Sequence, residues 1–316
     1  MKFGIITHPN SLNYGDDIQS LAAYKLLNKV DYLLDRENLN SPPSDNKIKL
    51  LCNGWFMEKP TNWPPANNIE PLFISFHITH NNKANKIMLD KDNISYFKKY
   101  EPIGCRDHYT VSLFNRIGIK AYYSGCITLT LENETKPFEK SDEILFVDPF
   151  NKNLPEAFRK KMFNKLVPDS IKNNIVHINH THLPSSEPMI DKLKYAENLI
   201  LRYSKAHLVV TSRIHVALPC IALGTPVLFM DVGFNLKNSR NRFSGIINYF
   251  NKMDNSVFPY TGLSPISLLF RKLHLYNYYY NNSKIKYDWE NPKPNLANIE
   301  PIVKNIKRTI SDFISD

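Results

Sequence analysis

The chain has 316 residues, of which 42% are hydrophobic and 22% charged, the composition of an ordinary folded protein rather than of a disordered chain. Its net charge of +10, from 40 basic and 30 acidic residues, favours an anionic partner such as a phosphorylated substrate, a membrane face or a nucleic acid, although Lys interleaved with Asn also arises from composition bias alone. No run approaches the ~18–20 apolar residues of a membrane span, no signal peptide is apparent, and four cysteines without CxxC spacing indicate buried thiols, so we expect a soluble protein of the cytoplasm.

The first half of the chain alternates short apolar runs with helical patterns. Residues 3–7 are typical of a strand, and a polar loop then leads to a helix that we expect Asp16 or Asp17 to cap. Further strands are predicted at residues 48–52, 72–76, 103–105, 121–123 and 127–131, and a further helix at 109–117, ended by Gly118. This alternation is typical of a parallel sheet covered by helices, whose ligands gather where the strands end.

A second α/β series follows a polar, proline-containing stretch at residues 132–143, where we place a domain boundary near residue 140. Strands are predicted at 144–147, 174–179, 206–210 and 226–230, and helices at 155–166, 187–204 and 213–223. After about residue 251 the pattern is less regular, although residues 302–314 have helical spacing. We therefore expect an α/β fold with two Rossmann-like domains, residues 1–140 and 141–316, facing each other across a cleft.

The sharpest feature is the segment from Thr211 to His215, at the end of a buried strand. Thr211 and Ser212 are expected to supply the turn and a helix cap, which leaves Arg213 and His215 in the first helical turn beside unpaired N–H groups. Such a place binds anions, and a His there can give or take a proton near neutral pH. The alternative is an ordinary buried His and a surface ion pair.

Two loops of the first half end strands in the same way. Gly15 lets the backbone approach a ligand and Asp16 can orient a hydroxyl, or the two are a plain loop glycine and helix cap. Arg106 faces the predicted cleft, or it pairs with Asp107 to fix a helix start. These alternatives stay open at the level of the residues.

The histidines raise the question of a metal. His77 and His80 are three residues apart, and His177, His180 and His182 are close together, but no carboxylate or Cys at ligand spacing joins them. We therefore expect no metal, and for these histidines either hydroxyl contacts or structural roles. The chain also contains no GxGxxG, GxxxxGK[ST] or GxSxG motif, so dinucleotide and Walker-type phosphate loops are not expected.

Four segments in this order resemble the polysaccharide pyruvyl transferase family: residues 13–17 (NYGDD), 105–107 (CRD), 211–226 (TSRIH through LGTP) and 241–245 (NRFSG). The resemblance covers roughly residues 1–250. It implies an architecture similar to two-domain glycosyltransferases of the GT-B type. It also implies transfer of a pyruvyl group from phosphoenolpyruvate to a sugar, with a pyruvate ketal and phosphate as products and no cofactor.

The resemblance also implies roles for particular residues. His215 matches the histidine proposed as general acid and Arg213 the arginine that binds the donor, with Ser212 and Arg106 as further donor contacts. Asp16 is implied as the group that orients or deprotonates an acceptor hydroxyl. The same motifs give Asn13, Gly15 and Arg242 as acceptor or cleft residues, and His182 of the histidine cluster is a further acceptor or cleft residue.

The expected partners are phosphoenolpyruvate and a sugar or lipid-linked glycan, with peripheral contact to an anionic membrane and no nucleic acid. Two other functions stay open. One is a GT-B-type glycosyltransferase that uses a nucleotide sugar. The other is a basic module without enzymatic activity that binds nucleic acid or an anionic polymer.

Overall fold

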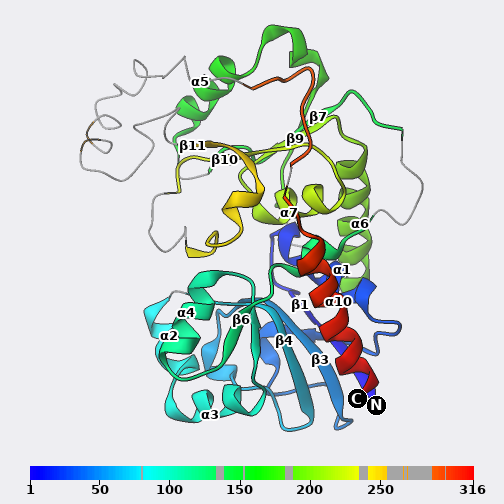
Figure 1. Ribbon diagram of the computed structural model, residues 1–316, viewed down its shortest axis with the longest axis vertical. Coiled ribbons are helices and arrows are strands. Elements are labelled where there is room, and N and C mark those ends of the chain that lie inside the picture. The colour runs from blue at the N-terminus through cyan, green and yellow to red at the C-terminus, as the bar shows by residue number, and fades with distance from the viewer. Residues whose placement is uncertain are drawn as a thin grey trace.

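The computed structural model of the protein describes residues 1–79, 81–132, 139–151, 154–181, 188–234, 241–254, 266, 269, 287–295 and 297–316. Two parallel sheets covered by helices make up the α/β fold (Figure 1). The first sheet has the strand order β2-β1-β3-β4-β5-β6 and the second β11-β10-β9-β7-β8.

The strands of the first sheet are β1 (Lys2–Thr7), β2 (Tyr32–Asp35), β3 (Ile48–Phe56), β4 (Ile69–Ile78), β5 (Ile103–Cys105) and β6 (Ala121–Tyr123). Those of the second are β7 (Ile144–Val147), β8 (Ile175–Ile178), β9 (Leu208–Thr211), β10 (Val227–Asp231) and β11 (Asn251–Asp254). The helices are α1 (Tyr14–Leu26), α2 (Asn82–Met88), α3 (Lys91–Lys99), α4 (His108–Arg116), α5 (Glu156–Leu166), α6 (Met189–Lys205), α7 (Ile214–Ala222) and α10 (Glu300–Ser315). Short 3₁₀ turns are η1 (Arg36–Asn38), η2 (Pro60–Asn62), η3 (Ile127–Thr130), η4 (Asp169–Asn174) and η5 (Ile247–Tyr249).

A shared layer of helices joins the two sheets. One apolar core contains Ile5 and Leu51 of the first sheet, Val209 of the second, and residues of α1, α6, α7 and α10. A second core on the opposite face of the first sheet is rich in aromatic rings, where Trp63 and Phe97 stack with centroids 5.2 Å apart. Of these helices, α1 and α7 follow β1 and β9 directly, and their first turns meet between the sheets, where Gly15 lies against His215.

Helix α10 returns from the end of the chain to the first sheet, beside which it runs in Figure 1. The Lys49 ammonium of β3 donates a 2.7 Å hydrogen bond to the carbonyl oxygen of Phe313 in the last turn of α10. Ile302 of the same helix packs on Gly125. The predicted boundary near residue 140 remains a prediction, and residues of the final helix complete the core of the first half.

Several local predictions were wrong. Residues 127–130 form the 3₁₀ turn η3 instead of a strand, and all four are buried. Asn13, not Asp16 or Asp17, caps α1, because its side-chain oxygen accepts a hydrogen bond from the N–H of Gly15. The edge strands β2 and β11 and the helices α2 and α3 were not predicted.

The structure tests the prediction that the cysteines are buried thiols. All four cysteines are buried and free, as expected. In the described part of the chain no helix is long and apolar enough to cross a membrane.

Candidate active site

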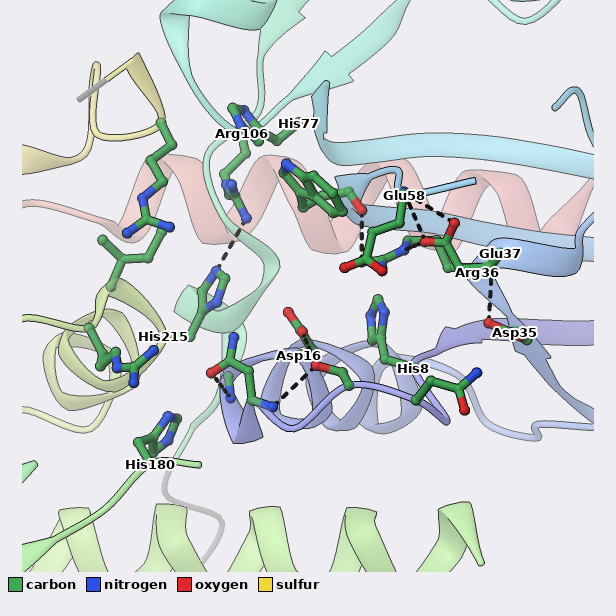
Figure 2. A pocket seen from close by; sticks show the side chains of 18 residues that line it. His8, Asp16, Asp35, Arg36, Glu37, Glu58, His77, Arg106, His180 and His215 are labelled. Atoms are coloured by element: carbon green, nitrogen blue, oxygen red, sulfur yellow. Dashed lines mark hydrogen bonds and ion pairs between the residues drawn. The ribbon is translucent and has the colours of Figure 1, made fainter. Parts of the chain in front are cut away.

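A pocket of about 310 Å³ lies where the carboxyl ends of the two sheets meet. Its walls come from both halves of the chain, and Figure 2 shows its side chains. The first half contributes His8, Asn10, Ser11, Asn13, Gly15, Asp16, Asp35, Arg36, Glu37, Trp55, Glu58, His77 and Arg106, and the second half His180, Arg213, Ile214, His215 and Arg242. Seven of the nine predicted site residues therefore line one pocket: Asn13, Gly15, Asp16, Arg106, Arg213, His215 and Arg242.

Helix α7 opens at this pocket and carries His215 in its first turn. Arg213 is the N-cap residue and its side chain does not cap the helix, so the predicted cap by Thr211 or Ser212 was wrong. The Thr211 hydroxyl instead accepts a bond from the N–H of Arg213, which shapes the turn. No acidic residue occupies the first turn of α7. The positive end of this helix therefore keeps its attraction for an anion.

Arg106 and His215 are in direct contact across the pocket, as the dashed line in Figure 2 shows. Arg106 Nη1 lies 3.2 Å from His215 Nε2 and also donates to the side-chain oxygen of Gln19. A guanidinium has no acceptor, so Nε2 accepts this bond and a neutral His215 carries its proton on Nδ1. The predicted alternative, an Arg106–Asp107 pair, is not what the structure has.

The surroundings of His215 favour its neutral form. Burial, together with the positive charges of Arg106 and Arg242, holds the pKa of His215 well below its usual 6.5. The pKa of Arg242 is itself lowered to about 10 by burial and by the charges of Arg106 and Arg213. The mutual repulsion of these cations would be relieved by an anion bound among them.

Asp148, which follows β7, positions Arg213. Its carboxylate accepts bonds from Nε and Nη2 of Arg213 at 3.1 and 2.8 Å, and from the backbone N–H of His180. Its carbonyl accepts from both the N–H and the hydroxyl of Ser212. Asp148 has a positive φ of 41°, an uncommon backbone conformation for a residue with a side chain. Sequence reasoning missed this residue, since the strand-end position after β7 was its only signal.

The first turn of α1 packs directly against His215. A Cβ on Gly15 would lie 3.0 Å from the His215 Cβ and 3.2 Å from its Nδ1. Because Gly15 has no side chain, His215 can pack this closely against the first turn of α1. Asp16, one residue further, accepts a bond from the Ser11 hydroxyl and lies in Figure 2 between His8 and His215.

A buried hydrogen-bonded pair, His77 and Asp107, lies next to Arg106, and burial lowers the pKa of His77 so that its neutral form is favoured. His77 Nδ1 is 2.5 Å from the Asp107 carboxylate, which also caps α4 by accepting from the N–H of Thr110. Burial acts to raise the pKa of Asp107, but His77 and Arg106 lower it overall. The pair fixes the end of β5 and with it the backbone that carries Arg106.

The remaining predicted residues have varied places. Ser212 does not line the pocket, because its hydroxyl is bonded to the Asp148 carbonyl. His182 and His80 lie outside the described residues. His180 is buried and lines the pocket, whereas His177 is exposed. Among the residues that the structure describes, no group of three or more His, Cys, Asp or Glu side chains is arranged to hold a metal ion.

Fold and site together define an α/β protein with a pocket at its strand ends, in which three arginines surround a neutral histidine at a helix start. The model of the polysaccharide pyruvyl transferase family matches residues 13–233. This range covers most of the chain, and the chain belongs to that family.

Other comparisons are more distant. A search of curated protein sequences found no match. An uncharacterized protein from Klebsiella pneumoniae superposes with a TM-score of 0.45 at 15% identity, over 80% of this chain and 92% of that one. The UDP-GlcNAc 2-epimerase of Methanocaldococcus jannaschii, solved with UDP-GlcNAc and UDP, superposes with a TM-score of 0.41 at 11% identity, over 99% and 100% of the two chains. At these scores neither likeness bears on function.

Proposed function

We propose that this protein transfers the pyruvyl group of phosphoenolpyruvate to two hydroxyls of a glycan, forming a pyruvate ketal and releasing phosphate. The observation that supports it best is the convergence of Arg106, Arg213 and Arg242 on His215 in one pocket. The donor carries a phosphate and a carboxylate, and guanidinium groups bind both with paired hydrogen bonds. The first turn of α7 adds N–H donors and a favourable dipole.

His215 is the group proposed to protonate the methylene carbon of the donor. In the free protein it is neutral, so it must gain a proton when the donor binds. The negative charges of the donor offset those of Arg106 and Arg242, which removes part of the repulsion that lowers the pKa of His215. Donor binding and proton uptake by His215 are then coupled, and His215 stays neutral while the site contains no donor.

The acceptor supplies the protons that the products need. Protonation of the methylene carbon makes the adjacent carbon electrophilic, and a sugar hydroxyl attacks it while Asp16 takes the hydroxyl proton. The carbon–oxygen bond to phosphate then breaks, and the second hydroxyl attacks the same carbon. Of the two hydroxyl protons, one ends on the new methyl group and one on the phosphate, so no net proton is consumed.

The direct test incubates the purified protein with phosphoenolpyruvate and a panel of bacterial glycans. Phosphate release together with a gain of pyruvate mass on an acceptor is expected. Calorimetry that detects no phosphoenolpyruvate binding but clear UDP-sugar binding would overturn the proposal in favour of a nucleotide-sugar transferase.

Variants separate binding from chemistry. His215→Asn should abolish turnover while the Kd of phosphoenolpyruvate changes by less than about tenfold. Arg213→Ala should weaken donor binding by about 2–4 kcal/mol, since it removes a charged hydrogen-bond donor. Glu70→Gln, at an exposed position of β4, is the matched control and should change neither. Full activity in both site variants would refute the assignment.

A further inference from the structure

The pocket has a second, acidic end that the donor does not account for. Asp16, Asp35 and Glu58 line it: Asp35 is the last residue of β2, and Asp16 and Glu58 come from the segments that follow β1 and β3. These strands are neighbours in the sheet order β2-β1-β3, so their carboxyl ends bring the three carboxylates together. The three arginines line the same pocket from β5 and the second half of the chain. One end of the pocket is therefore positively charged and the other end negatively charged.

Some carboxylates at this acidic end have structural roles. Asp35 accepts bonds from the N–H of Glu37 and the side chain of Asn38. The Glu37 carboxylate pairs with Arg36 and accepts from the backbone N–H of Glu58 and Lys59. These contacts hold the turn after β3 in place. The exposed carboxylate of Glu58 has no hydrogen bond or ion pair with the described residues, and it faces the pocket in Figure 2.

His8 is the unusual residue of this end. Its side chain is 3% exposed, and neither ring nitrogen has a hydrogen-bond partner among the residues that the structure describes. In Figure 2 its ring points toward Glu58 from the α1 side of the pocket. Buried polar groups are normally satisfied, so two unpaired nitrogens in a pocket wall mark a place for a polar ligand.

The protonation state of His8 defines the kind of ligand. Burial, opposed by the charge of Asp16, lowers the pKa of His8 to about 4, so the ring is neutral at physiological pH. A neutral imidazole offers one donor and one acceptor. A hydroxyl group likewise donates and accepts, whereas the carboxylates of Asp16 and Glu58 only accept. Neighbouring hydroxyls of a sugar ring satisfy all three groups at once.

We propose that His8, Asp16 and Glu58 form the acceptor subsite and that this subsite takes an uncharged, hydroxyl-bearing sugar unit and rejects one that carries a carboxylate. This inference rests on the proposed function, in which phosphoenolpyruvate occupies the end of the pocket that carries the arginines. A uronic acid would place its negative charge against two carboxylates, and it would be drawn to the arginines in competition with the donor. The indole of Trp55, in the same wall, adds apolar surface for the C–H groups of a sugar ring.

The test uses the full-length protein with ¹⁵N-labelled histidine, and His8→Asn assigns the ring signals of His8. Methyl glycosides of glucose, galactose, mannose and N-acetylglucosamine are titrated in turn, followed by methyl glucuronide, with and without phosphoenolpyruvate. At least one neutral glycoside should shift the His8 signals saturably, and the glucuronide should not do so at the same concentrations. Glu58→Gln should raise the Kd of that glycoside about tenfold, while Glu70→Gln leaves it unchanged.

Three results would overturn the proposal: no glycoside shifts His8, the glucuronide binds as tightly as the best neutral sugar, or Glu58→Gln binds as the wild type does. Calorimetry with phosphoenolpyruvate on the same samples separates this proposal from the proposed function. A protein that binds phosphoenolpyruvate but no sugar at His8 refutes the acceptor subsite alone. A protein that binds a neutral sugar at His8 but no phosphoenolpyruvate refutes the donor assignment and keeps the sugar subsite.

Discussion

The contact between Gly15 and His215 gives the most direct test of the site geometry, through Gly15→Ala. The new methyl group would lie 3.0 Å from the His215 Cβ and 3.2 Å from both its Nδ1 and the Asn13 side-chain oxygen. All three contacts are shorter than ordinary van der Waals separations, so the histidine or the helix start must shift by a few tenths of an ångström. His215 resists the shift, because it is buried and bonded to Arg106.

The expected magnitudes follow from two opposing effects. Alanine is favoured over glycine inside a helix by about 1 kcal/mol, and overpacking a close contact costs about 1–3 kcal/mol. The net loss of stability is therefore small, about 0–2 kcal/mol. The displaced histidine should nevertheless reduce turnover by about tenfold, since a misplacement of about 1 Å costs a catalytic group about 10²-fold and the shift here is smaller.

Turnover is measured by phosphate release and stability by urea unfolding. Gly224→Ala is the control, because Gly224 has a φ of 68° with nothing within 4 Å of its added Cβ. That variant should lose about 1–2 kcal/mol of stability from backbone strain and keep its turnover. If Gly15→Ala keeps wild-type turnover, the close packing of α1 on His215 has no part in catalysis.

Three further predictions concern Arg213, Asp17 and helix α10. Asp148→Asn should weaken phosphoenolpyruvate binding about tenfold in calorimetry, because it removes the charge that orients Arg213 at 2.8 Å; an unchanged Kd would mean that Arg213 is held by other contacts. Burial and the neighbouring Asp16 raise the pKa of Asp17 from 3.8 to about 7, so the folded protein keeps a proton that the unfolded chain has released, and stability is lost as the pH rises through this window. In Asp17→Asn the fall in unfolding free energy between pH 5 and pH 8 should be smaller than in the wild type, and an equal fall would contradict the assignment. Lys49→Met should lower stability by about 1–2 kcal/mol in thermal unfolding, because it removes the hydrogen bond to the last turn of α10. Lys47→Met, at an exposed position, is the control and should have no effect. Equal losses in the two variants would rule out this contact as the cause.

The sequence predicted most of the strands but missed β2 and β11, each of which lies at the edge of a sheet. β5, β6 and β7 have the predicted ends, because each is a short apolar run between polar or glycine residues. The edge strand β11 (Asn251–Asp254) contains a single apolar residue, Met253, so its sequence cannot be distinguished from that of a loop. Residues 127–130 have the alternation of a strand but are buried on all sides, so tertiary packing overrides the local pattern.

Site residues could be predicted where a motif follows a strand in the sequence. They could not be predicted where the pairing of strands determines which residues come together. Arg213 and His215 follow β9, and their place at a helix start is visible in the chain itself. Asp148 meets Arg213 because β7 and β9 are parallel neighbours, with Val147 opposite Thr211, and this register cannot be deduced from either segment alone. His8 and Glu58 likewise come together only through the strand order of the first sheet.

The return of α10 to the first sheet has a consequence for synthesis of the protein. Lys49 and Phe313 are 264 positions apart, so the flank of β3 stays uncovered until α10 has left the ribosome. The first half of the protein therefore cannot finish folding as it emerges, and its exposed apolar flank is open to non-native association in the interval. Only when α10 has packed against both halves is their shared core complete.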